Sequence, residues 1–348
     1  MKTEFIALSG DTNETDKLNI SRAAACIRRG GLVVFPTETV YGLGGDATDW
    51  QAAERIYAAK GRPADNPLII HIASCEDAER YAFTSPLYYR LAEAFMPGPL
   101  TVILKARDTV PKTVTAGLDT VAVRCPAHPI ANALIAAAGV PIAAPSANLS
   151  GSPSPTSAVH VLEDMDGRVD MILDGGESMI GLESTIVKPE EDGSLTLLRP
   201  GAITPEDLFA VVERVNVADA VFGALKKDQP VLSPGMKYKH YAPKTAFSLY
   251  TGSRAAEEAF IRDLPHGAAL FTHDEDIDRF SSLTGATLIP IGPRREPVVL
   301  AHRLFYLLRD ADKHGYSTLY APLPDPKGLG LALYNRMIRA AAHNIITL

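Results

Sequence analysis

The sequence predicts an α/β protein with two domains: an N-terminal domain built on a twisted, open, mixed sheet with helices, and a smaller C-terminal α/β domain of Rossmann-like pattern. Short apolar runs alternate with segments of helical periodicity through the first two-thirds of the chain. The alternation resumes after an interruption at residues 225–244. A length of 348 residues also suffices for two domains that each bury a core.

Helices of the first domain are predicted from capping and stop signals. Residues 21–31 combine helix formers with Arg28 and Arg29 before a Gly-Gly stop, and Asp49 is a suitable N-cap for a helix over 50–61. Three further helices are expected: 85–98, 128–139 and one that starts near Ser157.

Strands of the first domain are predicted from short apolar runs. These runs are 32–36, 67–72, 100–106, 120–126, 140–145, 171–176, 184–189 and 195–201. The last two are joined by a short connection, which predicts an antiparallel hairpin and therefore a mixed sheet.

The C-terminal region repeats the pattern in about a hundred residues. Strands are expected over 245–250, 267–273 and 317–322, and helices over 253–264, 298–314 and 330–343. The interruption contains three prolines, a glycine and several Lys and Tyr residues, without periodicity. We therefore predict domains at 1–222 and 245–348, with residues 223–244 as the linker between them.

The composition is that of a soluble protein in a reducing compartment. Three cysteines, Cys26, Cys75 and Cys125, are too few and too dispersed for a disulfide framework or a cysteine-rich zinc site. A formal charge of −7 argues against broad electrostatic adhesion to nucleic acid. With no apolar run of membrane-helix length and no basic-then-apolar leader, we expect a cytoplasmic protein without a membrane partner.

A glycine-rich segment at residues 42–47 matches G-x-G-x-x-A after a strand. This spacing occurs in dinucleotide-binding folds, where a helix N-terminus meets a pyrophosphate. Here a polar PTETVY separates the strand from the glycines, and the helix begins later. A tight turn is therefore the favoured interpretation and nicotinamide binding the alternative. The P-loop pattern is absent from the sequence.

Two cations, Lys60 and Arg62, follow a predicted helix end and are followed by Asn66 and by His71 within a strand. The pair either complements the C-terminal helix charge or clamps a phosphate, because Lys is a compact charge and Arg a planar fork. His71 in an apolar strand is most simply a core histidine.

A loop of small and polar residues over 145–156 lies between a strand and a helix. It contains Ser146, Asn148 and Ser154, whose side chains offer hydrogen-bond donors and acceptors. The simple interpretation is a surface loop. Its position at the carboxyl end of a strand, where open α/β sheets bind ligands, favours a binding loop instead.

Further polar residues occur at strand ends: Thr120, Arg124, Glu183, Ser184 and Arg199. A buried Arg124 needs an anionic partner, either a ligand or an internal Asp or Glu. Together these residues favour an anionic, nucleotide-like ligand. Nothing in the sequence indicates a catalytic triad, paired catalytic carboxylates or a metal-ligand cluster.

Six motifs in this order resemble the YrdC-like threonylcarbamoyl-AMP synthase family in its long, two-domain form. They are PTETVYGLG, KGRPADNPL, TVAVR, PSANLSG-x-x-SPT, ESTIV and SPGMKYKHYAP. The resemblance runs from about residue 15 to the C-terminus. It implies a YrdC-like catalytic domain followed by a Rossmann-like domain.

The resemblance implies a reaction in which L-threonine, bicarbonate or CO2, and ATP with Mg²⁺ give threonylcarbamoyl-AMP and pyrophosphate. A separate transferase complex would then use the product, through transient contact, to modify adenosine 37 of tRNA. The enzyme itself would need no stable nucleic-acid binding.

The resemblance also assigns residues. Lys60 and Arg62 would be catalytic. ATP would be bound by Lys60, Arg62, Asn66, Thr120, Ser146, Asn148, Ser154, Arg199 and Tyr238. Threonine would be bound by Thr37 or Thr39, His71, Arg124, Ala144 and Ser184. We expect only one of the two PTET threonines to face the ligand.

The linker carries Lys237, Tyr238, Lys239, His240 and Tyr241, and family resemblance suggests that it folds over the active site as a lid. A plain tether is the simpler interpretation. Alternative functions are an RNA-binding or ribosome-associated module, a nicotinamide oxidoreductase, and a carbamoyltransferase of the hydrogenase-maturation type, whose extra modules are missing here.

Overall fold

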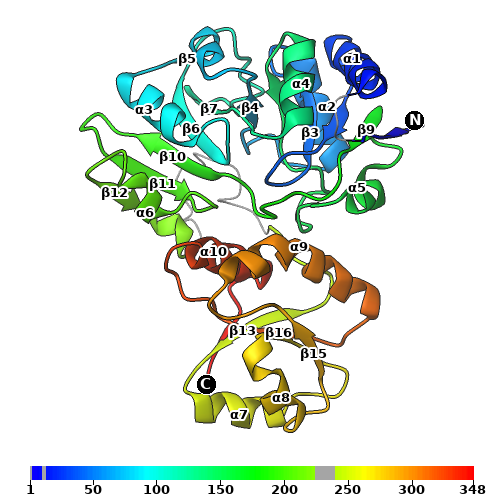
Figure 1. The fold of residues 1–348 in the computed structure, drawn as a ribbon, viewed down its shortest axis with the longest axis vertical. Helices are drawn as coiled ribbons and strands as arrows, with labels where there is room; N and C mark the ends of the chain where they lie inside the picture. The colour runs from blue at the N-terminus through cyan, green and yellow to red at the C-terminus, as the bar shows by residue number, and fades with distance from the viewer. Residues whose placement is uncertain (1, 10–12, 224–239) are drawn as a thin grey trace.

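Two β-sheets, each covered by helices, make up the protein (Figure 1). The computed structural model describes residues 2–9, 13–223 and 240–348. In the larger sheet the strand order is β1-β9-β2-β3-β8-β4-β7-β6-β10-β11-β12, with β5 paired to β6, and in the smaller one it is β15-β14-β16-β13-β17. Within the described residues, no helix has the length and apolar character that a membrane span requires.

Strand bounds in the larger sheet are as follows: β1 (Glu4–Ala7), β2 (Val33–Phe35), β3 (Gly42–Asp46), β4 (Ile69–His71), β5 (Ala82–Phe83), β6 (Leu100–Ala106), β7 (Thr120–Arg124), β8 (Ile142–Ala143), β9 (Met171–Asp174), β10 (Thr185–Pro189), β11 (Leu195–Arg199) and β12 (Val215–Val217). In the smaller sheet they are β13 (Phe247–Thr251), β14 (Ala269–Thr272), β15 (Thr287–Pro290), β16 (Leu319–Pro322) and β17 (Ile345–Thr347).

The α-helices are α1 (Glu14–Arg28), α2 (Trp50–Lys60), α3 (Pro86–Phe95), α4 (Pro129–Ala138), α5 (Ala158–Met165), α6 (Pro205–Leu208), α7 (Arg254–Arg262), α8 (Ile277–Ser281), α9 (Pro297–His314) and α10 (Gly330–Ala340). Short 3₁₀ helices occur as η1 (Cys75–Arg80), η2 (Asp219–Val221) and η3 (Asp274–Asp276).

Alternating side chains bury both faces of each sheet. In β2, Val33 and Phe35 pack with α1 and α4, whereas Val34 faces the core formed with α2, α3 and α5. In the smaller sheet α9 and α10 cover one face, and α7 and α8 cover the other. The smaller sheet is wholly parallel and the larger one is mixed. The predicted fold class is confirmed.

Most of the helices and strands predicted for the larger domain are present, and the predicted capping and stop residues begin and end them. The Asp49 side chain accepts a hydrogen bond from the Gln51 N–H at the start of α2, and Gly61 ends that helix with φ 61. The predicted hairpin is formed by antiparallel β10 and β11. The first helix begins earlier than predicted, at Glu14, because Asn13 caps it by accepting from the Asp16 N–H.

The glycine-rich segment corrects the prediction of a tight turn. Gly42 to Asp46 form strand β3, antiparallel to β2. A Cβ on Gly44 would lie 2.7 Å from Ile142 Cγ2 and 2.8 Å from Phe35 Cε1. Glycine is therefore needed here for close packing between neighbouring strands, which also leaves no phosphate-binding turn in this segment.

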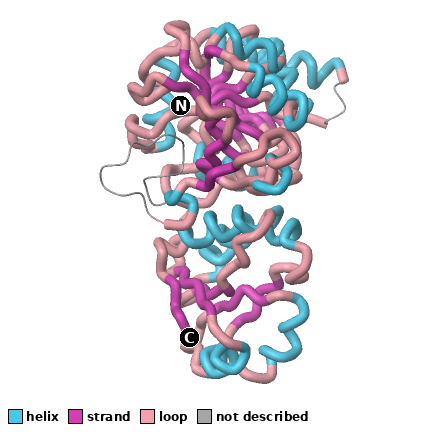
Figure 2. Tube along the Cα trace, turned by 90° about the vertical axis from the view of Figure 1, so that its left-hand side faces the viewer, coloured by secondary structure: helices cyan, strands magenta, loops and turns pink. Residues whose placement is uncertain are grey.

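Helices α9 and α10 of the C-terminal region lie between the two sheets (Figures 1 and 2). On α9, the Arg309 guanidinium donates to the Pro153 carbonyl at 2.6 Å and pairs with Asp164 at 2.6 Å. Gly181, with φ 80, approaches α9 so closely that a Cβ would lie 2.5 Å from the His302 carbonyl oxygen. Of the predicted linker, residues 224–239 lie outside the described residues.

We predict that Gly44→Ala lowers the free energy of unfolding of the larger domain by about 1–3 kcal/mol, because the added methyl overpacks the contact with Ile142 and Phe35. The measurement is urea unfolding followed by the fluorescence of Trp50, which is the single tryptophan of the chain and lies on α2.

Gly223→Ala is the matched control, because nothing lies within 4 Å of a Cβ at that position. Its unfolding midpoint should equal that of the unsubstituted protein. An equal midpoint for Gly44→Ala would contradict the packing role of this glycine.

Candidate functional site

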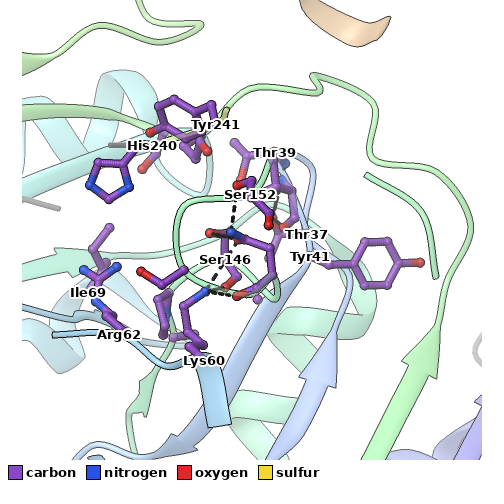
Figure 3. Close-up of a pocket in the computed structure, with 18 of the residues that line it drawn as sticks. Thr37, Thr39, Tyr41, Lys60, Arg62, Ile69, Ser146, Ser152, His240 and Tyr241 are labelled. Carbon is purple, nitrogen blue, oxygen red and sulfur yellow. Dashed lines mark hydrogen bonds between the residues drawn. The ribbon is translucent and has the colours of Figure 1, made fainter. Parts of the chain in front are cut away.

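A cavity of about 60 Å³ lies where the ends of α2, β4 and β7 and the loop after β8 meet the C-terminal region (Figure 3). Predicted site residues dominate its lining: Thr37, Thr39, Lys60, Arg62, His71, Arg124, Ala144, Ser146, Asn148, Ser184 and Arg199. Parallel neighbours β4 and β7 place His71 level with Arg124, which explains why residues distant in sequence converge here. What these residues bind stays a prediction.

Both PTET threonines line the cavity, whereas only one of them was expected to face it. Residues 38–40 form a bend rather than a strand. The hydroxyls of Thr37 and Thr39 lie 2.8 Å apart, and the Thr37 hydroxyl donates to the Val40 carbonyl at 2.6 Å. Residues two apart already share a face of an extended chain, and in the bend their two hydroxyls stay in contact.

Lys60 is buried and points into the loop that follows β8 (Figure 3). Its ammonium donates to the Ser146 carbonyl, and to the Asn148 carbonyl at 2.6 Å. Burial, and then the nearby positive charge of Arg62, hold the pKa of Lys60 well below its ordinary value. An anion entering the cavity would favour the charged form of this lysine.

Arg62 lies at the cavity wall on the loop after α2. Its guanidinium donates to the carbonyls of Asn66 at 3.3 Å and Pro67 at 3.1 Å, so the loop holds the side chain in place. Asn66 itself is buried and supports this loop without lining the cavity.

Arg124 forms an ion pair with an internal carboxylate. The sequence allowed either this or an anionic ligand as its partner. Its guanidinium pairs with Glu38 at 2.7 Å, and both side chains are about 5% exposed. Burial raises the pKa of Glu38, but Arg124 more than offsets this and the net shift is downward. Burial, and then the charge of Arg124, lower the pKa of His71 to about 3, so His71 is neutral at physiological pH.

Arg199 holds Ser184 at the cavity wall. Its Nε donates to the Ser184 carbonyl and its Nη2 to the Ser184 hydroxyl, each at 3.0 Å. The same hydroxyl lies 2.7 Å from that of Thr101 on β6. Burial lowers the pKa of Arg199 to about 10, so the group still carries its charge at neutral pH.

A second buried ion pair brings the C-terminal region to the cavity. Arg336 of α10 is fully buried, and its Nε pairs with Glu183 at 2.7 Å. The Ser154 hydroxyl donates to the other oxygen of Glu183. Burial raises the pKa of Glu183, but Arg336 and Arg199 together leave it below its ordinary value. Sequence reasoning missed Glu38 as the partner of Arg124, and it missed Arg336.

His240 and Tyr241 form the wall opposite Lys60 (Figure 3). The Tyr241 ring packs against Phe305 of α9 with centroids 5.2 Å apart, and the Arg336 guanidinium lies 5.5 Å from its centroid. Tyr241 has φ 64, which is unusual for a residue with a side chain. Burial lowers the pKa of His240 to about 3.

Three predicted residues lie away from the cavity lining, and one lies outside the described residues. Thr120 begins β7 and Arg124 ends it, so about 13 Å of strand separates them. Ser154 bonds to Glu183, and Asn66 supports the Arg62 loop. Tyr238 is the residue that the structure does not describe. Within the described ranges, no group of three or more His, Cys, Asp or Glu residues could hold a metal ion.

Two family models match nearly the whole chain. One, Sua5/YciO/YrdC, described as "Telomere recombination", matches residues 25–201. The other, described as "Threonylcarbamoyl-AMP synthase, C-terminal domain", matches residues 203–342.

Individual proteins give the same result. The chain is 45% identical over 335 residues to a threonylcarbamoyl-AMP synthase of Pyrococcus abyssi, and this alignment covers 95% of this chain and 96% of the relative. It is 41% identical over 353 residues to that of Bacillus subtilis, which covers 99% and 100%. The crystal structure of P. abyssi Sua5 complexed with L-threonine matches at TM-score 0.88 and 41% identity over 100% of both chains.

We predict that Arg336→Met lowers the free energy of unfolding by about 3–5 kcal/mol, because Glu183 is left as an uncompensated buried charge. Urea unfolding measures the change. The double variant Arg336→Met with Glu183→Gln should regain most of the loss, since it buries no charge. A double variant as unstable as the single one would contradict this account.

The lowered pKa of Glu183 predicts a pH dependence. Its carboxylate contributes stability that is fully present above the unfolded pKa of about 4.3 and is lost as the pH falls through the lower folded value. The stability difference between the unsubstituted protein and Glu183→Gln should therefore shrink below about pH 4. Unfolding curves across this range measure it, and a constant difference would refute the assignment.

Proposed function

The chain belongs to the threonylcarbamoyl-AMP synthase family, and we propose that its cavity joins L-threonine, bicarbonate or CO2, and ATP into threonylcarbamoyl-AMP and pyrophosphate, a nucleotidyl transfer. The observation that carries the proposal is the convergence of four basic side chains on one cavity: Lys60, Arg62, Arg124 and Arg199.

The reaction joins two anions, which explains the need for these cations. The threonine amine adds to CO2, and an oxygen of the resulting carbamate attacks the α-phosphorus of ATP while pyrophosphate leaves. The protein must offset the charge repulsion and hold the reacting atoms in line. We assign Lys60 and Arg62 to the triphosphate, and Ser146, Asn148 and Arg199 to the rest of the nucleotide subsite.

We place threonine against the other half of the lining: Thr37, Thr39, His71, Arg124, Ala144 and Ser184. The threonine-bound P. abyssi structure supports a threonine site in this family. Arg124 would take the threonine carboxylate. Its contacts with Glu38 and the Gly98 carbonyl use only some of its five N–H groups, so a ligand carboxylate need not displace Glu38. Neutral His71 adds no charge that would repel the amine.

Mg²⁺ would enter with the triphosphate. The described residues offer it no cage of carboxylates, and both oxygens of Glu183 are already hydrogen-bonded. A magnesium ion held mainly by substrate phosphates is common and would offset their charge. We assign no residue of this chain to the metal.

A cavity that can exclude water fits a product that water destroys. His240 and Tyr241, both buried, form one wall of this cavity. We propose that the wall formed by His240 and Tyr241 moves aside for substrates and returns to exclude water from the acyl-adenylate. Release of the product to a separate cytoplasmic transferase that acts on tRNA would complete its use.

The proposal predicts pyrophosphate release from ATP and Mg²⁺ that requires both threonine and bicarbonate. Each co-substrate is omitted in turn, and serine replaces threonine as the amino-acid control. AMP should accumulate as the product decays. Release that is indifferent to threonine would contradict the proposal and leave a nucleotide pocket of other use.

Arg62→Ala should lower kcat/KM for ATP about 10- to 150-fold, since a charge-assisted hydrogen bond is worth about 1.5–3 kcal/mol. Arg80→Ala is the matched control: Arg80 is exposed and pairs with Asp77 away from the cavity. Steady-state kinetics measure both, with circular dichroism to establish folding. Equal rates for the two variants would remove Arg62 from the site.

A further inference from the structure

Two thiols lie side by side outside the cationic cavity. Cys75 begins η1, four residues after His71, and Cys125 directly follows Arg124 at the end of β7. The Cys125 thiol donates to the Ala73 carbonyl at 3.6 Å, which places its sulfur beside the segment that carries Cys75. Because β4 and β7 are parallel neighbours with His71 level with Arg124, the two chain segments leave the sheet together.

Both thiols line a second cavity of about 530 Å³, which is open to solvent. Cys75 is half-buried and Cys125 fully buried, so a reagent in solution meets Cys75 first. The neighbouring Cys125 thiol lowers the pKa of Cys75 despite its partial burial, whereas the Cys75 thiol and burial raise the pKa of Cys125. Cys75 therefore has the greater thiolate fraction.

The third cysteine provides an internal comparison. Cys26 lies in α1, buried in the apolar cluster between α1, α4 and the larger sheet. Burial raises the pKa of its thiol. Among the three cysteines of the chain, Cys75 is therefore the one whose thiol is both accessible and readily ionised.

We propose that Cys75 and Cys125 are a modification site, at which thiol–disulfide exchange with a small disulfide such as glutathione disulfide forms a Cys75–Cys125 bridge. The bridge joins the two sulfurs, which line one cavity, by a covalent bond of about 2.05 Å.

Two exchanges complete the reaction. The Cys75 thiolate attacks one sulfur of glutathione disulfide, which forms a mixed disulfide and releases one glutathione thiolate. Cys125 then loses its proton to a base in solution and attacks the Cys75 sulfur, which releases the second glutathione. Two protein thiols are oxidised and one glutathione disulfide is reduced to two glutathione molecules.

The bridge acts on the neighbouring cavity wall. The Gly98 N–H donates to the Cys125 carbonyl at 2.8 Å, and Arg124 Nε donates to the Gly98 carbonyl at 3.3 Å. Movement of Cys125 toward Cys75 therefore shifts the backbone that carries Arg124 and its hydrogen-bond partner. Under the proposed function, on which this consequence rests, the KM for threonine should rise several-fold.

The bridge itself is tested without reference to activity. Reduced full-length protein is incubated with glutathione disulfide, and intact-mass spectrometry should show the loss of two hydrogen atoms, reversed by dithiothreitol. Non-reducing digestion should link the peptide of Cys75 to that of Cys125. A wild-type protein that carries only glutathione adducts, or a bridge to Cys26, would overturn the proposal.

Single variants separate the two steps. Cys26→Ser should form the bridge as before, and Cys125→Ser should stop with glutathione on Cys75. Cys75→Ser should remain unmodified at the buried Cys125. Glutathione on Cys125 in this last variant would overturn the assignment of Cys75 as the first nucleophile.

Activity gives the second readout. Pyrophosphate release by bridged and reduced protein should show a higher KM for threonine in the bridged form, with KM for ATP unchanged, and oxidant should not affect Cys75→Ser. An unchanged KM for threonine in protein with a proven bridge would refute the effect on the cavity wall. Absence of release in the reduced protein would refute the proposed function alone, because the mass result stands independently.

Discussion

The buried ion pair between Glu183 and Arg336 is the constraint on which the arrangement of the whole cavity depends. Glu183 comes from the ESTIV segment of the larger domain and Arg336 from the last long helix of the chain. A carboxylate without water needs a partner, and the larger sheet directs Arg124 and Arg199 elsewhere, to Glu38 and Ser184. The C-terminal region thus completes the electrostatics of a cavity whose basic and hydroxyl residues, from Thr37 to Arg199, lie more than a hundred positions earlier. It is structurally part of the site.

Much of the cavity lining could be predicted from the sequence, because its residues occur within short motifs and at the ends of short strands. Lys60 and Arg62 sit at a helix end, and His71 and Arg124 at strand ends, so the positions where these elements stop bring them together. Long-range partners were beyond sequence reasoning. Nothing in the sequence shows that Arg336 lies beside Glu183, because that contact depends on how α10 packs against the larger domain. Glu38 was missed because the bend of the PTET segment is a tertiary feature.

The fold shows the same division. Apolar runs such as 100–106 and 120–126 predict buried strands, and capping residues such as Asp49 determine where helices begin. Strand β3 was missed because a glycine-rich strand lacks the β-branched and aromatic residues that identify one. Its glycines are explained only by Phe35 and Ile142, contributed by neighbouring strands. Edge strands such as β12 and β17 are three residues long, too short for a periodic signal.

The left-handed backbone of Tyr241 stores energy in one wall of the cavity. Such a conformation in a residue with a side chain costs on the order of 1–3 kcal/mol, and it persists where surrounding contacts enforce it. The contacts here are the ring's packing on Phe305 and Arg336, both from the C-terminal helices. Release of the ring would relax the backbone and so return part of the free energy lost when those contacts break. The two arrangements are thereby brought nearer in energy, as the movement proposed for the wall of His240 and Tyr241 requires.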